Sequence, residues 1–167
     1  MSDFKLQQGD CFVVKTDGWV SAPIRFIEKW QSLDGEATYN HAGIIVSDTG
    51  QTFESLEKID HYKLDDYKGC QILIFRRIEM TQGLFWPAYK SVLKYDGKVY
   101  PAWRMPLFIL RIAKWFRWTF PVCSELVMMF ECGCGLRKKW AGYSPDNIAD
   151  EVRISKFYQI KFEGVWS

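Results

Sequence analysis

The sequence has few of the side chains from which metal and disulfide sites are usually built. It contains two histidines, His41 and His61, and five cysteines, an odd number without the spacing of a disulfide framework. Cys132 and Cys134 form a close pair with no second ligand pair to match, whereas a structural zinc site normally takes four ligands. We therefore expect free thiols, no metal and no other cofactor.

Long apolar runs and a strong excess of one charge are also missing. No stretch of about 18 uncharged apolar residues occurs, and the N-terminus has no basic segment followed by an apolar run, so we expect a cytoplasmic protein without a membrane span. The net charge is +2, with scattered lysines and arginines. Since nucleic-acid binders gather such residues on one face, we expect no nucleic-acid partner.

Aromatic side chains, in contrast, are abundant. Aromatic residues make up 17% of the chain and hydrophobic residues 48%, with eight tryptophans. A chain of 167 residues is long enough to bury a core without metal or disulfide bonds. The composition therefore predicts a single globular domain spanning residues 1–167.

The order of local patterns predicts an α+β fold. β-Branched and alternating stretches predict strands at 11–16, 42–46, around Phe53, 70–78 and 157–164, while helical periodicity predicts helices at 21–32, 81–95, 103–118, from Cys123 onward and briefly at 144–151. The polar stretch 59–69 is interpreted as a connection. In the helix at 81–95 the expected apolar face is Leu84, Phe85, Ala88, Val92 and Leu93. This order favours a mostly antiparallel sheet packed against helices.

Residues 103–118 combine apolar and basic side chains. On a helical wheel the four basic residues cover roughly 140°. Such a helix can lie on a membrane or line an acyl groove. It can equally be a core element whose arginine and lysine side chains reach out to water. The second interpretation is favoured, and peripheral membrane contact through 103–118 remains the alternative.

Cys123 stands where a helix is expected to begin, in the stretch FPVCSELVMMFE. A thiol is nucleophilic only as its thiolate, and the unpaired N–H groups and dipole of a helix start favour that charge. Pro121 and the apolar periodicity after Cys123 predict this position. A catalytic thiol also needs a base, and the chain has two imidazoles to offer.

His41 is the better candidate base. It enters a predicted strand in NHAG, whereas His61 lies among charged residues and is interpreted as a solvated surface group. Glu54 follows His41 by thirteen residues across a turn and is the only carboxylate inside the two strands, so a hairpin would bring it beside the imidazole and let it orient the ring. From the residue types alone, a packed structural thiol and a locally bonded histidine are the more common interpretation.

The motifs NHAGIIV, FES and CSELV, in this order, resemble the permuted NlpC/p60 group of papain-like cysteine hydrolases, in its YiiX-like branch. Smaller matches, which extend the resemblance over residues 9–150, are Gly9-Asp10, Gly97-Lys98, Tyr100 and Ser144-Pro145-Asp146. The resemblance implies a circularly permuted, papain-like NlpC-type fold. It also implies a Cys123-His41-Glu54 triad that cleaves an amide bond, peptide or isopeptide, through an acyl-enzyme. The backbone N–H of Cys123 or Ser124 would bind the oxyanion.

Two positions depart from the family's pattern. Val122 stands where the family often has tyrosine before the nucleophile, and Pro101 stands where it has aspartate. These changes bear on the oxyanion side and on substrate contacts more than on the triad. Tyr100, Trp103 and Val122 are the candidate walls of a substrate groove, although dense aromatic residues are more often core.

Three functions remain open at this point. The first is an amidase or peptidase acting on a peptide-like substrate. The second is a lipid acyl hydrolase, acyltransferase or thioesterase, which would use the same triad on an acylated substrate. The third is an inert binding module that keeps the fold, against which the joint presence of Cys123, His41 and Glu54 argues.

Overall fold

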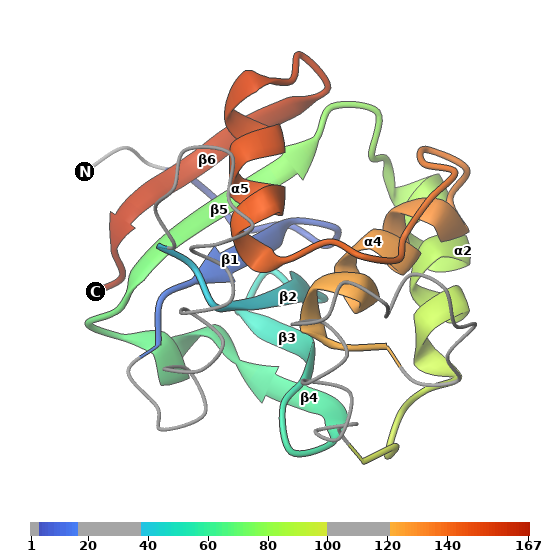
Figure 1. Cartoon of the computed structure of the whole chain (residues 1–167), viewed down its shortest axis with the longest axis horizontal. Helices are drawn as coiled ribbons and strands as arrows, with labels where there is room; N and C mark the ends of the chain where they lie inside the picture. Colours follow the sequence, from blue (N-terminus) through green and yellow to red (C-terminus); the bar gives the residue numbers. More distant parts are fainter. Residues whose placement is uncertain (1–3, 17–37, 100–120) are drawn as a thin grey trace.

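The computed structural model describes residues 4–16, 38–99 and 121–167 (Figure 1). Its centre is a six-stranded sheet in the order β4-β3-β2-β1-β5-β6, in which each neighbouring pair is antiparallel. The strands are β1 (Cys11–Val14), β2 (His41–Ile45), β3 (Gln51–Ser55), β4 (Ile59–Lys63), β5 (Gln71–Arg77) and β6 (Tyr158–Val165). The helices are the 3-10 helix η1 (Leu64–Tyr67), α2 (Gln82–Leu93), α4 (Cys123–Gly133) and α5 (Pro145–Ile154).

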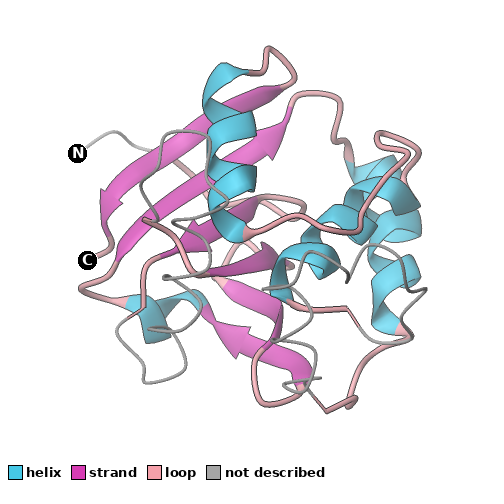
Figure 2. Ribbon diagram, in the orientation of Figure 1, coloured by secondary structure: helices cyan, strands magenta, loops and turns pink. Residues whose placement is uncertain are grey.

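The sheet separates two apolar layers. Successive side chains of a strand point to opposite faces, so Val13, Ile44 and Phe53 join the helices in one core cluster. Phe12 and Ile45 join residues of η1 in the other. Figure 2 shows α2, α4 and α5 gathered over one side of the sheet. The central strands are therefore buried on both faces, which explains their unbroken apolar runs.

Most predicted elements are present. The strands predicted at 11–16, in the hairpin, at 70–78 and at 157–164 are confirmed with bounds that differ by a few residues, as are the helices that become α2, α4 and α5. The α+β class and the antiparallel sheet are confirmed with them. The helices predicted at 21–32 and 103–118 lie outside the described residues, and so do the groove candidates Tyr100 and Trp103.

The interpretation of residues 59–69 as a connection is wrong. This stretch forms the edge strand β4 and then η1, with Phe53 of β3 paired to His61 and Thr52 paired to Tyr62. An edge strand has one neighbour and one exposed margin, so it carries polar residues that hide its pattern. Pairing with β3, the second strand of the hairpin, gives residues 59–63 their extended conformation.

The predicted apolar face of α2 is also partly wrong. Leu93 is 37% exposed, whereas Tyr89 is buried together with Phe85, Ala88 and Val92. Phe85 stacks on Tyr89 with ring centroids 5.4 Å apart and meets Phe130 of α4 at 6.0 Å. Packing against α4 therefore rotates the buried stripe of α2 towards Tyr89.

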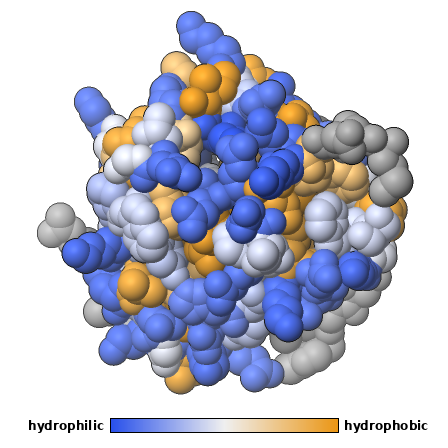
Figure 3. Space-filling model, turned by 180° about the vertical axis from the view of Figure 1, so that it is seen from behind, coloured by the Kyte–Doolittle hydropathy of each residue, from blue (hydrophilic) through white to orange (hydrophobic). Residues whose placement is uncertain are grey.

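The rear surface is largely hydrophilic. Seen from behind, hydrophobic side chains appear in small groups between hydrophilic ones (Figure 3). Within the described ranges, no helix combines the length and the apolar character needed to span a bilayer.

Candidate active site

The hairpin of β2 and β3 brings His41 and Glu54 together. The register places Gly43 opposite Glu54, and His41 lies on the same face of β2 as Gly43 because strand side chains alternate. His41 Nε2 lies 2.6 Å from Glu54 Oε2. The two side chains are 8% and 0% exposed, so the contact is screened little by water.

A glycine between them makes this approach possible. A Cβ atom on Gly43 would lie 2.6 Å from ring carbons of Phe12 and 2.7 Å from Cγ of Glu54. Both neighbours are fully buried, so neither has free space into which to move. The glycine of the NHAG motif therefore serves the close packing of Glu54 and Phe12 over β2.

Cys123 is the first residue of α4 and is buried, 7% exposed. The Cys123 side chain lies close enough to His41 to raise the pKa of the imidazole, and because Glu54 takes Nε2, Nδ1 is the nitrogen available to the thiol. The hydroxyl of Ser55 donates to the carbonyl of Pro121 at 3.3 Å. The strand that carries Glu54 thus also holds the chain that leads into Cys123.

The start of α4 is arranged around its backbone amides. Val122 is the N-cap residue of α4, and its backbone N–H donates to Glu125 Oε2 at 3.3 Å. Its apolar side chain makes no capping hydrogen bond within the described part of the chain. Ser124 Oγ donates to the carbonyl of Tyr143 at 2.5 Å and so ties α4 to the loop before α5. Val122 itself is buried, 5% exposed.

Electrostatics favour a charged imidazole at this position. Burial lowers the pKa of His41, but the hydrogen bonds and charges of Cys123 and Glu54 outweigh burial and raise that pKa to about 10. An imidazolium between a carboxylate and a thiol stabilises the thiolate. The arrangement therefore has the chemistry of an activated thiol nucleophile.

Two further residues at the site were missed by the sequence analysis. The hydroxyl of Tyr67 donates to Glu54 Oε2, and the hydroxyl of Thr52 donates to Glu54 Oε1. Thr52 shares a strand face with Glu54, so alternation within β3 was a usable signal. Tyr67 has no such signal, because it belongs to η1, in the stretch interpreted as a connection.

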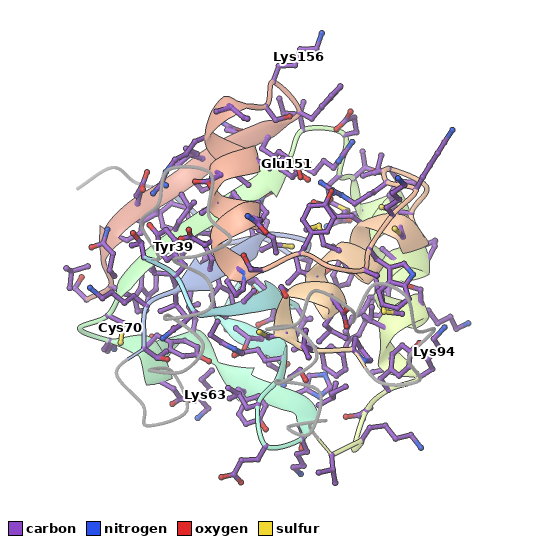
Figure 4. The ribbon with its side chains drawn as sticks, viewed as in Figure 1. Tyr39, Lys63, Cys70, Lys94, Glu151 and Lys156 are labelled. Carbon is purple, nitrogen blue, oxygen red and sulfur yellow. The ribbon has the colours of Figure 1, made fainter. Side chains whose placement is uncertain are left out.

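The strand that carries His41 is held at its start. Asp146 Oδ1, at the beginning of α5, accepts from the backbone N–H groups of Thr38 and Tyr39 at 3.0 and 3.3 Å. Figure 4 labels Tyr39 at the start of β2, close to α5. Asn40 accepts from Thr16 N–H at 2.9 Å and donates to Thr16 O at 2.8 Å. These motif residues therefore position the chain around His41.

His61 lies apart from this site. Its ring packs on Phe53 with centroids 5.1 Å apart, and its Nε2 bonds the hydroxyl of Tyr89 at 2.5 Å. The side chain is 31% exposed, so the expected solvated role is only partly right. The contacts of His61 with Phe53 of β3 and Tyr89 of α2 explain why its side chain is partly buried.

The described residues do not fit a metal centre well. Asp60, His61 and Asp96 offer ligand atoms within 4.8 Å of one another, but the ammonium of Lys58 already contacts the Asp60 carboxylate. A cation would have to displace it. Cys123, His41 and Glu54 do not form such a group of ligand atoms among the described residues.

Comparison with known proteins supports the fold. No protein-family model and no curated protein matches this sequence. A solved structure that does match is the crystal structure of the metalloprotein YiiX from Escherichia coli O157:H7, assigned to DUF1105, with a TM-score of 0.57 and 18% identity. The match covers 98% of this chain and 89% of that one. At this identity the likeness shows the fold alone: the chain has a YiiX-like α+β fold.

Proposed function

We propose that this chain is a permuted papain-like cysteine hydrolase that cleaves an amide bond, peptide or isopeptide, through an acyl-enzyme. The observation that carries the proposal is the series Cys123, His41, Glu54: His41 Nε2 lies 2.6 Å from Glu54 Oε2, and Cys123 at the start of α4 helps raise the pKa of the same buried imidazole. The YiiX-like fold and the order of the motifs support the papain-like assignment.

In the acylation step the thiol proton passes from Cys123 Sγ to His41 Nδ1, and the thiolate attacks the carbonyl carbon of the scissile bond. The developing oxyanion is bound by the backbone N–H groups of Cys123 or Ser124 at the start of α4. His41 then returns the proton to the leaving nitrogen. The C–N bond breaks, the amine departs and a thioester to Cys123 remains.

In the deacylation step water takes the place of the amine. His41 Nδ1 accepts a proton from water as the oxygen attacks the thioester carbonyl. The C–S bond breaks, the acid departs and the thiol of Cys123 is restored. Glu54 holds the imidazole through both steps.

A substrate panel tests the chemistry. Wild type and Cys123→Ala would be compared on isopeptides, peptidoglycan fragments, thioesters and phospholipids. We expect wild type alone to release an amine from a peptide or isopeptide. Release from thioesters or phospholipids only would support the acyl hydrolase alternative, in which 103–118 contacts the membrane, and no turnover of any substrate would support an inert module.

Thiol labelling tests the activation of Cys123 without a known substrate. Near pH 6 we expect iodoacetamide to modify Cys123 at least about tenfold faster than Cys11 or Cys70, since an ordinary thiol is protonated there. Burial raises the pKa of Cys11 well above its usual value, which makes it a matched slow control. His41→Ala should remove the advantage. Equal labelling of all three thiols, unaffected by His41→Ala, would contradict catalysis.

A further inference from the structure

Glu54 is the most heavily bonded side chain of the site. It is fully buried, and an unpaired carboxylate there would cost several kcal/mol. Its Oε2 accepts from His41 Nε2 and from the Tyr67 hydroxyl, while its Oε1 accepts from the Thr52 hydroxyl. Three donors therefore compensate one buried charge, and two of them come from residues outside the triad.

Tyr67 can act here only as a donor. An ionised carboxylate accepts hydrogen bonds and donates none, so the hydroxyl must supply the hydrogen. Burial and the negative charge of Glu54 raise the pKa of Tyr67 far above its usual value. The phenol therefore keeps its proton at neutral pH and can donate it to Glu54.

This occupation of Glu54 determines which ring nitrogen of His41 carries hydrogen. Because both oxygens accept from hydroxyls and remain acceptors, the His41 nitrogen that faces them must be Nε2–H. In the neutral imidazole Nδ1 is then left without hydrogen, and it is the nitrogen not taken by Glu54. Nδ1 is the nitrogen that the proposed mechanism uses to take the thiol proton.

Tyr67 reaches Glu54 from outside the strands, from the 3-10 helix η1. Tyr67 ends η1, which is anchored by the hydrogen bond from Leu64 N–H to the carbonyl of Gly50 at 2.8 Å. The ring of Tyr67 lies 5.6 Å from that of Phe12 and 5.9 Å from that of His41. Packing on both rings sets the direction from which its hydroxyl reaches Glu54.

We propose that Tyr67 and Thr52 are positioning residues that hold Glu54 as an ionised, fully occupied acceptor, so that His41, whenever its imidazole is neutral, is the Nε2–H tautomer with Nδ1 available to Cys123. The catalytic consequence rests on the proposed function. The tautomer of His41 does not depend on the proposed function, so the positioning role and the proposed function can be tested, and can fail, separately.

Nitrogen-15 NMR of histidine-labelled protein reads the tautomer directly, because the chain has only two histidines and His61 provides an internal reference. The Cys123→Ala variant is used so that neutral His41 can be observed without a thiolate partner. We expect the Nε2–H form in this variant and a mixture of tautomers after Tyr67→Phe is added. An Nδ1–H signal for His41 in Cys123→Ala, or the same spectrum after Tyr67→Phe is combined with Cys123→Ala, would overturn the proposal.

Kinetics of the otherwise wild-type enzyme provide the second measurement. We expect Tyr67→Phe to lower kcat about 10- to 100-fold with little change in KM, as the loss of a hydrogen bond to a charged group would. Tyr62→Phe, which removes a hydroxyl bonded to the carbonyl of Lys58, is the matched control and should leave kcat unchanged.

Thr52 keeps the proposal testable if Tyr67→Phe does not fold. Thr52→Val removes the hydroxyl at nearly constant shape and should lower kcat in the same way, whereas Thr52→Ser keeps a donor and should retain more activity. Equal activity of Val and Ser variants would count against the proposal. Wild type inactive on every substrate would refute the proposed function, while the NMR result would still decide the tautomer.

Discussion

At the residue scale, the imidazole of His41 is the centre of the site. Its Nε2 lies 2.6 Å from the Glu54 carboxylate, and the hydrogen bonds and charges of Cys123 and Glu54 raise the pKa of His41 to about 10 despite burial. A pKa raised on folding stabilises the folded protein fully below the ordinary value near 6.5, and this stabilisation is lost as the pH rises through about 10. The same proton is the one the leaving amine needs, so activity should persist up to that pH.

Glu54→Gln should therefore move the alkaline limit of activity. The substitution removes the negative charge that helps raise the pKa of His41, so that pKa should fall towards its ordinary value. We expect the alkaline limb of the kcat/KM profile to shift from about pH 10 to lower pH. Glu57→Gln, which changes an exposed carboxylate, is the control. Unchanged profiles in both variants would show that Glu54 does not act through His41.

At the element scale, the site depends on how closely β1, β2 and β3 pack. Phe12, Gly43 and Glu54 come from three neighbouring strands and meet on one face of the sheet. α4 begins where β3 ends, because Ser55 bonds the carbonyl of Pro121. The nucleophile and its two partners are therefore positioned by strand register and one helix start.

Gly43→Ala should damage both packing and catalysis. The new methyl group would overlap the Phe12 ring and the stem of Glu54, and overpacking of this kind costs about 1 to 3 kcal/mol. We expect lower unfolding free energy in urea and lower kcat. Gly83→Ala in α2 is the matched control, because a Cβ there meets only Thr81 Oγ1 at 3.8 Å, and its stability should be unchanged or higher. Equal behaviour of the two alanine variants would contradict a tight fit at Gly43.

At the scale of the whole molecule, α4 is held at both ends. Its N-terminus meets the sheet at the site, and near its C-terminus the buried Glu131 accepts from Tyr158 of β6 at 2.7 Å and from Arg137 at 3.2 Å. Arg137 also pairs with Glu151 of α5, which Figure 4 labels on that helix. Burial raises the pKa of Glu131, against the opposing effects of Tyr158 and the arginines. This network joins α4, α5 and β6 into one body.

Glu131→Ala should lower global stability. It leaves Arg137 and the Tyr158 hydroxyl without their shared buried acceptor, and breaking a buried ion pair costs about 3 kcal/mol or more. Urea unfolding followed by circular dichroism measures this change, and Glu57→Ala, at an exposed position, should stay within about 0.5 kcal/mol of wild type. A loss for Glu131→Ala as small as for the control would show that the network does not stabilise the fold.

Much of this could be predicted because the signals are local. The hairpin alternates and contains its own turn, so the approach of Glu54 to His41 followed from spacing alone. The start of α4 followed from Pro121 and the apolar pattern after it. The scarcity of histidine then limited the bases available to Cys123, although its contact with His41 joins residues far apart in the chain.

The sequence by itself determined most of the described elements and the order of the candidate triad, because strand alternation, helix periodicity and turns arise between near neighbours in the chain. Only the tertiary structure decided that 59–69 forms β4 and η1, that α2 buries Tyr89, and that Tyr67 reaches Glu54. Pairing at a sheet edge, helix-on-helix packing and hydrogen bonds to a buried charge join residues whose spacing carries no period. Their positions follow from how the layers pack, and no local pattern encodes that.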